Sequence, residues 1–482
     1  MSERIAALAA QLGVSTPQLL AIAAVALPLA AVLLNVAAQV LLPRDPSLPP
    51  LVFSYVPVLG SAVTYGMDPY KFFADCRAQH GDLFTFRLLG RNVTVALGAK
   101  GSNLIFNGRL NEVSAEEAYT SLTTPVFGKD VVYDVPNAVL MEQKKFVKVG
   151  LSTENFRVYV GQITDEVTGF MKGDEGFSAF WRDGKSEAPV DIFKAMCEIT
   201  ILTASRTLQG REVRESLDKS YADLYHDLDG GFTPINFVIP NLPLPANFRR
   251  DRAQKLMSDF YRGIIEKRRK EGGDSADHDM IAALMDQSYK NGRKLSDIEI
   301  AHIMIALLMA GQHTSSATGS WAMLRLASRP EFIEELYQEQ QSVYGDGAGG
   351  LRPLDYDTQK SSVPVLDAVV RETLRLHPPI HSIMRKVKSD IVVPAALAAP
   401  GADSKKSDSA AYVIPKGHFV MAAPGVSQVD PKIWRDSETF DPNRWLGKGE
   451  IEPEEQGETV DYGWGAISSG ANSPYLPFGA GR

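Results

Sequence analysis

One long helical pattern constrains the fold of this 482-residue chain more than any other feature. Ser296-Asp-Ile-Glu299 has the spacing of a capping box, in which the Ser and Glu side chains pair with free backbone amides at a helix start. The helical pattern continues to Ser328, just before Pro330. About 32 residues at 1.5 Å each give a helix of roughly 48 Å, enough to cross a whole domain. Its first half, AHIMIALLMA, is apolar nearly all round, so we predict that it is buried.

Five polar residues interrupt this apolar helix at its centre, in the sequence Gly311-Gln-His-Thr-Ser-Ser316. Buried polar groups cost free energy unless they are hydrogen-bonded. The segment therefore predicts either a satisfied polar cluster that kinks the helix or a site for water or a ligand. Gly311 lacks a side chain and would let another group approach the backbone closely.

A second helix is predicted from Val365 to His377, where Pro378-Pro379 ends it. Glu372 and Arg375 lie three residues apart and share one face of this helix. Exposed pairs of this kind contribute little to stability. Because the flanking residues are apolar, we expect the pair to be partly buried, and a buried Arg would need further acceptors.

An uncharged run of 24 residues from Leu19 to Leu42 is long enough to span a bilayer. Pro28, Asn35 and Gln39 weaken it, yet a membrane anchor remains the favoured interpretation over a signal peptide or a buried helix. The predicted organisation is a tail at 1–18, a transmembrane anchor at 19–42, a proline-rich hinge at 43–50 and one globular domain at 51–482.

Composition and pattern place that globular domain in the mainly α class with small β-sheets. The net charge of −8 gives no support to nucleic-acid binding, and two cysteines cannot form a disulfide framework. Two low-complexity segments, 345–350 and 398–411, should be surface loops. The helical patterns include Ala253–Lys270 and Asp279–Tyr289, and the strand-like stretches are Leu83–Leu88, Asn92–Leu97, Ser389–Val393, Tyr412–Ile414 and Phe419–Ala422.

The order of four motifs indicates a family. The polar-centred helix is followed by Glu372-Thr-Leu-Arg375, then by Phe440-Asp-Pro-Asn-Arg444-Trp445, then by Pro477-Phe-Gly-Ala-Gly-Arg482. In this order and at these separations the chain resembles the cytochrome P-450 superfamily of haem-thiolate monooxygenases. The resemblance covers the chain after the hinge and implies a cytochrome P-450 fold preceded by an N-terminal transmembrane helix.

Finer motifs resemble the sterol (lanosterol) 14α-demethylases, fungal type, within this superfamily. They are Tyr119-Thr-Ser-Leu-Thr-Thr-Pro-Val-Phe-Gly-Lys-Asp-Val-Val-Tyr133-Asp, Asp227-Leu-Asp-Gly-Gly and Gly311-Gln-His-Thr-Ser. The resemblance implies oxidative removal of the 14α-methyl group of lanosterol or eburicol in ergosterol biosynthesis. It also implies haem b with its iron, O2, electrons from NADPH through a membrane-bound cytochrome P-450 reductase, and binding of azole inhibitors. The enzyme would lie in the endoplasmic reticulum membrane as a single-pass protein with a cytosolic catalytic domain.

The resemblance also implies roles for individual residues, grouped here by role. Proton delivery and oxygen activation would involve Thr314, His313 and Asp229. Contacts to haem would come from Tyr119, Tyr133, Lys144, Arg385, Phe478, Gly479 and Gly481. The sterol would be lined by Leu122, Phe127, Val131, Ile380, His381, Ile383 and Met384. The haem-binding loop would be supported by an ion-pair triad of Glu372, Arg375 and Arg444. Phenols and cations are suitable donors to the haem carboxylates.

The family pattern continues beyond Arg482 to a cysteine whose thiolate binds iron. Neither Cys76 nor Cys197 lies in a glycine-rich loop, so we expect no metal ligand among the 482 residues. The sequence is thus expected to be an incomplete record of a longer protein and to be inactive as it stands. Two alternatives remain open: another membrane-bound lipid monooxygenase, or a non-catalytic lipid-binding remnant that lacks the haem thiolate.

Overall fold

The computed structural model describes residues 9–11, 13–173, 190–217, 219–271, 278–393, 412–447 and 473–481. The predicted loop at 398–411 lies outside these residues. The chain clusters into two compact units that each combine separate stretches of sequence. Unit 1 comprises residues 1–114 and 384–426, and unit 2 comprises residues 115–383 and 427–482.

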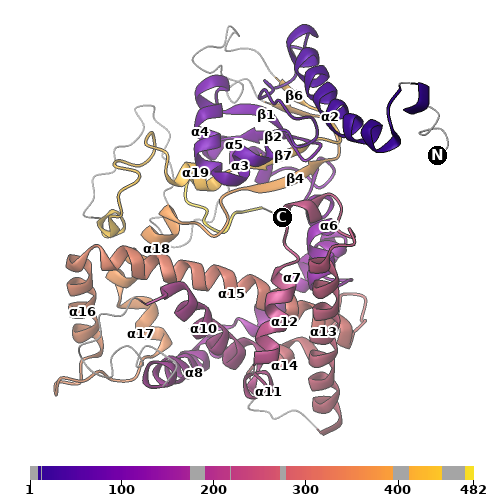
Figure 1. Ribbon diagram of the computed structural model, residues 1–482. Coiled ribbons are helices and arrows are strands. Elements are labelled where there is room, and N and C mark those ends of the chain that lie inside the picture. Colours follow the sequence, from indigo (N-terminus) through magenta and orange to yellow (C-terminus); the bar gives the residue numbers. More distant parts are fainter. Residues whose placement is uncertain are drawn as a thin grey trace. The chain divides into compact units, whose positions relative to one another are not determined.

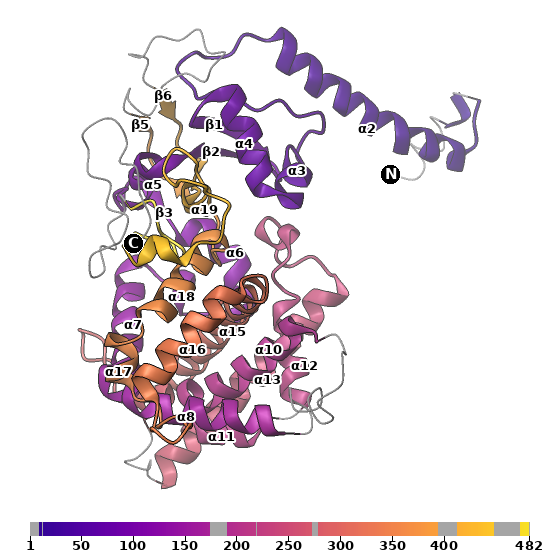
Figure 2. The same cartoon turned by 90° about the vertical axis from the view of Figure 1, so that its left-hand side faces the viewer.

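Unit 1 contains the β-sheets and the N-terminal helices. Its helices are α2 (Thr16–Leu41), α3 (Ala62–Met67), α4 (Pro69–His80) and α5 (Gly98–Phe106), and α19 (Pro424–Gln428) begins in it. Its strands are β1 (Leu83–Leu88), β2 (Arg91–Ala96), β3 (Val113–Ser114), β4 (Ile383–Val387), β5 (Ile391–Val393), β6 (Tyr412–Ile414) and β7 (Phe419–Ala422). The main sheet has the order β1-β2-β7-β4-β3, and β5 pairs with β6 in a second sheet (Figures 1 and 2).

The strands predicted from the sequence are confirmed to within about two residues, but β3 and β4 were missed. The β1 and β2 strands are antiparallel, with Leu83 opposite Ala96, whereas β2 and β7 are parallel. The β3 strand has only two residues and pairs with β4 from far along the chain. A strand this short carries no alternation of apolar and polar residues, so pairing between distant segments is what defines it.

Helix α2 coincides with the uncharged run. Among the described residues it is the one helix long and apolar enough to cross a bilayer, and none of its residues is buried (Figure 2). The polar residues that weakened the prediction have partners. Asn35 Nδ2 donates to the carbonyl oxygens of Ser54 (2.7 Å) and Tyr55 (2.9 Å), and Gln39 Nε2 donates to Ser54 O at 2.8 Å. Their amides are thus satisfied without water.

The proline-rich segment after α2 is fastened to the strands. Ser47 O accepts a hydrogen bond from Val413 N at 2.8 Å, and Pro50 O accepts one from Thr85 N at 2.6 Å. Thr85 lies on β1 and Val413 on β6. Residues 43–50 therefore run along unit 1 instead of forming a free tether.

Unit 2 is almost entirely helical. Its α-helices are α6 (Glu116–Phe127), α7 (Asn137–Gly150), α8 (Thr153–Lys172), α10 (Ile192–Ala204), α11 (Arg211–Glu215), α12 (Lys219–Asp229), α13 (Pro245–Glu271), α14 (Met280–Met285), α15 (Asp297–Ala327), α16 (Pro330–Tyr344), α17 (Tyr356–Ser361) and α18 (Pro364–Leu376). Short 3-10 helices are η1 (Val132–Asp134), η3 (Pro234–Phe237) and η5 (Pro442–Trp445), and η2 (Ser205–Gln209) is a π-helix.

The long helix predicted from the capping box is confirmed as α15, with 31 residues and both capping-box hydrogen bonds at Ser296 and Glu299. It contacts α6, α10, α13, α14, α16 and α18, and Figure 1 shows it as one uninterrupted element. Most of its first half is buried, from Ile300 to Met309 with two half-buried exceptions, as the apolar pattern predicts. Helix α15 is thus the central support of unit 2.

Two other helices differ in length from their predictions. Helix α13 begins eight residues before the predicted Ala253, at Pro245. Helix α14 ends at Met285, not at Tyr289, because the chain reverses there: Tyr289 N donates to Arg293 O at 2.8 Å, and Ser288 bridges to Lys294. The helical pattern continued past the turn because both sides of it pack on the same core.

Deleting residues 1–42 should release the protein from membranes, because α2 supplies the apolar length that a bilayer requires. We expect most of the shortened protein in the supernatant after a high-salt wash of membranes, measured by immunoblotting. The double variant Asn35→Ala/Gln39→Ala is the control. It loses the hydrogen bonds to Ser54 but keeps the apolar helix, so it should stay in the pellet. Full retention of the deletion variant would mean that α2 is not the anchor.

Candidate functional site

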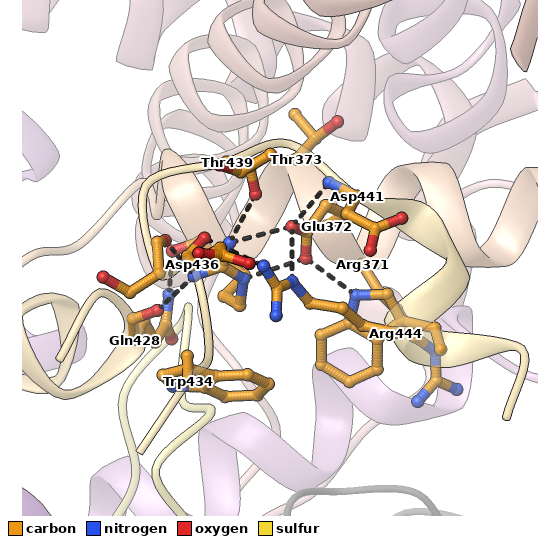
Figure 3. A network of polar contacts seen from close by, with 12 residues as sticks. Arg371, Glu372, Thr373, Gln428, Trp434, Asp436, Thr439, Asp441 and Arg444 are labelled. Carbon is orange, nitrogen blue, oxygen red and sulfur yellow. Dashed lines mark hydrogen bonds and ion pairs between the residues drawn. The ribbon is translucent and has the colours of Figure 1, made fainter. Parts of the chain in front are cut away.

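A fully buried carboxylate, that of Glu372 on α18, organises the C-terminal part of unit 2. It accepts hydrogen bonds from Nε and Nη2 of Arg375, both at 2.8 Å, and Arg444 Nε lies 3.3 Å away. The backbone amide of Asp441 donates to it at 3.0 Å (Figure 3). The indole of Trp445 also donates to it at 3.0 Å. The structure thus brings Glu372, Arg375 and Arg444 together. The carboxylate is fully hydrogen-bonded, which a buried charge requires.

The Arg375 guanidinium uses its remaining donors on an irregular stretch of backbone. Nη1 donates to Gln428 O at 2.8 Å and Ser437 O at 2.6 Å, and Nη2 donates to Thr439 O at 3.2 Å. Arg375 is also fully buried, and its guanidinium lies 5.2 Å from the centre of the Trp434 ring. One side chain therefore satisfies the carbonyl group at the end of α19 and two carbonyl groups of the irregular backbone after it.

Gln428 extends this network to the predicted haem-binding loop. Its Nε2 donates to the carbonyls of Leu374 and Arg375 at 2.9 Å, and its Oε1 accepts from the amide of Leu476 at 2.8 Å. Leu476 directly precedes the segment Pro477-Phe-Gly-Ala-Gly. The same segment is held by Tyr475, whose ring centre lies 4.8 Å from that of Trp445.

The glycine-rich segment itself needs glycine where it turns. Gly479 and Gly481 have φ values of +73° and +84°, in the region that disfavours side chains. A Cβ at Gly479 would overlap Cδ1 of Ile383, so the backbone passes very close to that side chain. Phe478, directly before Gly479, is 58% exposed. The segment thus presents an exposed aromatic ring beside a backbone free of side chains.

The polar centre of α15 is only partly buried, contrary to the prediction. Gln312 and Ser316 are buried, and Gln312 Nε2 donates to Cys197 O on α10 at 2.7 Å. Thr314 Oγ1 and Ser316 Oγ donate back to carbonyls four residues earlier, at 2.8 and 2.7 Å. The side chain of His313 is 46% exposed. Because these hydroxyl groups form hydrogen bonds to the backbone of their own helix, they neither interrupt α15 nor need partners in the core.

His313 pairs with Asp229 at the end of α12, with Nε2 and Oδ1 2.6 Å apart. The hydrogen bond to Asp229 raises the pKa of His313, and burial opposes the shift only in part. The ring of Tyr225, one turn earlier on α12, lies 5.9 Å from the imidazole. The pair joins α12 and α15, and the Asp229 carboxylate favours the protonated imidazole.

Tyr119 on α6 and Tyr133 in η1 stack on each other, with ring centres 5.3 Å apart. Thr120 Oγ1 donates to Tyr133 O at 2.6 Å, which fixes η1 against α6. On the other side, Gln143 of α7 accepts from Val132 N at 3.1 Å and donates to Asp130 O at 2.9 Å. The stacked phenols are therefore held from two helices.

The other predicted haem and sterol residues are distributed over both units. Lys144 is an exposed residue of α7, whereas Arg385 is buried on β4 of unit 1. Val131 is buried in the core of unit 2, and Phe127 packs against that core. The remaining predicted sterol-lining residues are half-buried Leu122, His381 and Ile383, exposed Ile380 and, in unit 1, buried Met384.

Sequence reasoning missed a close contact between α15 and the loop after α6. His302 is buried, and its Nδ1 lies 2.8 Å from Lys129 O. Gly128 has a φ of +104°, and a Cβ there would overlap the His302 ring. Both residues border a pocket of about 670 Å³ lined mainly by polar side chains, which includes none of the predicted sterol-lining residues. A glycine after a helix signals a turn, but it does not indicate which distant side chain fills the space.

Comparison with known proteins identifies the family. A sequence model of cytochrome P450 matches residues 49–482. The chain belongs to the cytochrome P450 family. The match spans parts of both compact units, so they are parts of one family fold.

Individual relatives and one solved structure agree with this. The chain is 67% identical over 466 residues to lanosterol 14-alpha demethylase of Mycosarcoma maydis, covering 95% of this chain and 82% of the relative. It is 50% identical over 458 residues to eburicol 14-alpha-demethylase of Uncinula necator, covering 94% and 83%. The structure of a retinoic acid-bound cyanobacterial cytochrome P450, CYP120A1, superposes with a TM-score of 0.69 at 22% identity, covering 91% of this chain and 87% of that one. This likeness shows the fold.

Cytochromes P450 are haem-dependent monooxygenases that use O2 and electrons supplied by a reductase, and the residues present suit the haem carboxylates. Stacked phenols and the ammonium group of Lys144 are suitable donors to carboxylates. The two cysteines do not suit the iron. Burial raises the pKa of Cys76 to about 12, which keeps it a thiol, and Cys197 lies within α10.

Glu372→Gln should destabilise unit 2 strongly, by about 3–5 kcal/mol, because it leaves two buried guanidinium groups without their carboxylate. Asp367→Asn on the same helix is the matched control. Asp367 pairs with Arg371 at 2.6 Å, but these side chains are 60% and 36% exposed, so the loss should stay below about 1 kcal/mol. Urea unfolding of both variants measures the difference. An equal loss of unfolding free energy in both variants would show that burial does not make the Glu372 pair contribute more than the Asp367 pair.

Proposed function

We propose that this protein is a sterol 14α-demethylase, which removes the 14α-methyl group of lanosterol or eburicol and releases it as formate in ergosterol biosynthesis. The observation that carries the proposal is the 67% identity, over 95% of the chain, to a protein named lanosterol 14-alpha demethylase. The relative at 50% identity is named for eburicol, so either sterol suits the proposal.

Haem would be held by residues from several elements. Tyr119, Tyr133, Lys144 and Arg385 would donate to its carboxylates, and Phe478, Gly479 and Gly481 would lie against the macrocycle. When bound, haem supplies the activation of O2, with electrons from NADPH through a membrane-bound reductase. Stacking fixes both phenol rings before any ligand arrives, which reduces the entropy lost on binding.

The triad has an indirect role in this proposal. Glu372, Arg375 and Arg444 touch neither haem nor sterol; they position the chain that does. The connection runs from Arg375 through the Gln428 carbonyl and side chain to the Leu476 amide. Because every link is buried, the glycine-rich segment is held in place by hydrogen bonds that water does not compete for.

The sterol would lie among apolar side chains that exclude water. The proposed lining consists of Leu122, Phe127, Val131, Ile380, His381, Ile383 and Met384. The Phe127 ring is oriented by an edge contact with Phe232, with centres 5.8 Å apart. Azole inhibitors would compete for the same space. The N-terminal segment would anchor the enzyme in the endoplasmic reticulum membrane as a single-pass protein, with the catalytic domain, residues 51–482, in the cytosol.

Proton delivery would use His313, Asp229 and Thr314. The imidazolium of His313 is favoured by the Asp229 carboxylate and is accessible to solvent, so it can take up a proton from water. The Thr314 hydroxyl lies next in the sequence and bonds to Ala310 O, which fixes its rotamer. In this proposal the three side chains would pass protons from the end of α12 to the polar centre of α15.

A direct assay tests the proposed reaction. In haem-loaded protein extended through the family's haem loop, with O2, saturating reductase and NADPH, lanosterol or eburicol should become its 14-desmethyl product. One formate should form per turnover, detected by mass spectrometry. Omission of NADPH is the control. Turnover of another lipid with no sterol product would favour a different membrane-bound monooxygenase. Sterol binding without any turnover would favour a non-catalytic lipid-binding protein.

The proton path predicts a pH effect. Asp229→Asn removes the carboxylate that raises the pKa of His313, so turnover should fall about tenfold or more and its decline with rising pH should begin at lower pH. His313→Ala should be as slow at all pH values, and both variants should keep the sterol-induced spectral change. Asp227→Asn, two residues away and paired with Arg249, should behave as the parent.

The same pair makes the free energy of unfolding depend on pH. Because folding raises the pKa of His313, the pair adds to the free energy of unfolding. This contribution is complete below about pH 6.5 and is lost as the pH rises through the raised pKa. Parent-rate turnover in both Asp229→Asn and His313→Ala would exclude the proton path. Loss of folded, haem-loaded protein would instead identify the pair as a structural link.

A further inference from the structure

A small pocket of about 300 Å³ opens in unit 1 directly after the apolar helix. It is bordered by the proline-rich segment, by β1 and β2 and by the β6–β7 turn. Its lining consists of Arg44, Asp45, Pro46, Leu48, Pro49, Pro50, Leu51, Thr85, Arg87, Asn92, Tyr412, Pro415 and His418. All of these residues belong to unit 1. This volume is at the small end for ligand sites and suits a polar head group better than a sterol.

Two arginines line the pocket without carboxylate partners among the described residues. Arg87 Nη1 donates to Asn35 Oδ1 at 2.7 Å, a neutral acceptor. Burial, together with the neighbouring charge of Arg87, lowers the pKa of Arg44, so the two cations affect each other. The single lining carboxylate, Asp45, accepts from Ser47 N at 2.8 Å and Ser47 Oγ at 2.7 Å. The lining therefore carries an excess of positive charge.

His418 adds a donor that has no acceptor among the described residues. Asn92 Nδ2 lies 3.2 Å from His418 Nε2 and donates to it. The neutral ring, which burial favours by lowering the pKa of His418, then carries its proton on Nδ1. That atom is buried and has no hydrogen-bond partner. A buried N–H without an acceptor costs free energy, and an anionic oxygen that reached it after a small turn of the ring would remove this cost.

The position of the pocket identifies the source of such an anion. Helix α2 ends at Leu41, and Arg44 follows three residues later, at most about 10 Å along the chain. If α2 spans the bilayer, Arg44 and Arg87 lie at the depth of the lipid head groups, where Arg and Lys meet phosphates. Guanidinium groups bind phosphate oxygens in pairs, and the arrangement of Arg44, Arg87 and His418 supplies donors from three separate segments.

We propose that this pocket binds the phosphate of an anionic phospholipid head group. The lipid chains would lie along the apolar surface of α2, and the phosphate would take the donors of Arg44, Arg87 and His418. The proposal rests on membrane insertion of α2 and not on the sterol reaction. Bound lipid would fasten unit 1 to the membrane surface at a defined point.

Thermal unfolding of the full chain in neutral detergent micelles tests the site. Dihexanoyl phosphatidic acid, which carries a phosphate and two short chains, should raise Tm in a saturable way. Arg44→Gln should weaken its apparent affinity at least about tenfold, since one charge-assisted contact is lost. Arg44 is exposed, so this variant should fold as the parent does. Arg87→Gln should have the same effect.

Two variants control for nonspecific effects. Arg109→Gln removes an exposed arginine of unit 1 away from the pocket and should leave the affinity unchanged. Asn35→Ala removes the hydrogen bond to Arg87 but keeps its charge, so the lipid should still bind. Equal affinity of the parent and both arginine variants would overturn the proposal, as would an equal loss in Arg109→Gln.

Soluble anions distinguish the lipid from free phosphate. Inorganic phosphate should raise Tm only at concentrations at least tenfold higher than the lipid, and dihexanoyl phosphatidylcholine, with its own cation, should bind more weakly than phosphatidic acid. Inorganic phosphate that binds as tightly as the lipid would assign the pocket to a free anion and would refute the head-group assignment.

Discussion

The buried carboxylate of Glu372 is the constraint on which the C-terminal part of unit 2 depends. A charge removed from water must be hydrogen-bonded or it destabilises the fold by several kcal/mol. Glu372 meets this need with donors from its own helix and from residues 441–445. Arg375, which neutralises it, in turn satisfies carbonyls at Gln428, Ser437 and Thr439. Polar contacts thereby hold the segment 428–445 against α18. The glycine-rich segment is positioned in turn by the hydrogen bond from the Leu476 amide to Gln428.

The first half of helix α15 supports unit 2, and its second half carries the polar side chains proposed to move protons. At its start, burial would raise the pKa of Glu299, but hydrogen bonds from Arg293, Ser296 and Tyr289 lower it to about 2, so this end stays capped and charged. The following turns are buried in the core, which fixes the axis of the helix. Only then do polar side chains appear, with Gln312 facing α10 and His313 reaching Asp229. A rigid first half allows the second half to hold a titratable group at a defined place without a kink.

Local signals predicted much of this arrangement, and distant pairings did not. The capping box gave the start of α15, and the three-residue spacing of Glu372 and Arg375 indicated their contact. The carbonyl acceptors of Arg375 lie more than fifty residues away, at the end of the short helix α19 and in the irregular backbone after it, where no periodicity reveals them. Strands β3 and β4 and the contact of Gly128 with His302 were missed for the same reason. The exposure of His313 could not be predicted either, because composition along a helix does not say which neighbours cover each face.

Polar groups in and directly after α2 are hydrogen-bonded, as the buried polar groups around Glu372 are. Asn35 and Gln39 would be costly in an apolar span, but they are paired with the backbone of residues 54 and 55 and, through Asn35, with Arg87. The proline-rich segment is fastened to β1 and β6 instead of swinging freely. A helix that is hydrogen-bonded to the unit it anchors transmits its own tilt to that unit. The orientation of unit 1 at a membrane would therefore be set by these polar contacts, and a head-group phosphate between Arg44 and Arg87 would add a second point of attachment on the same side.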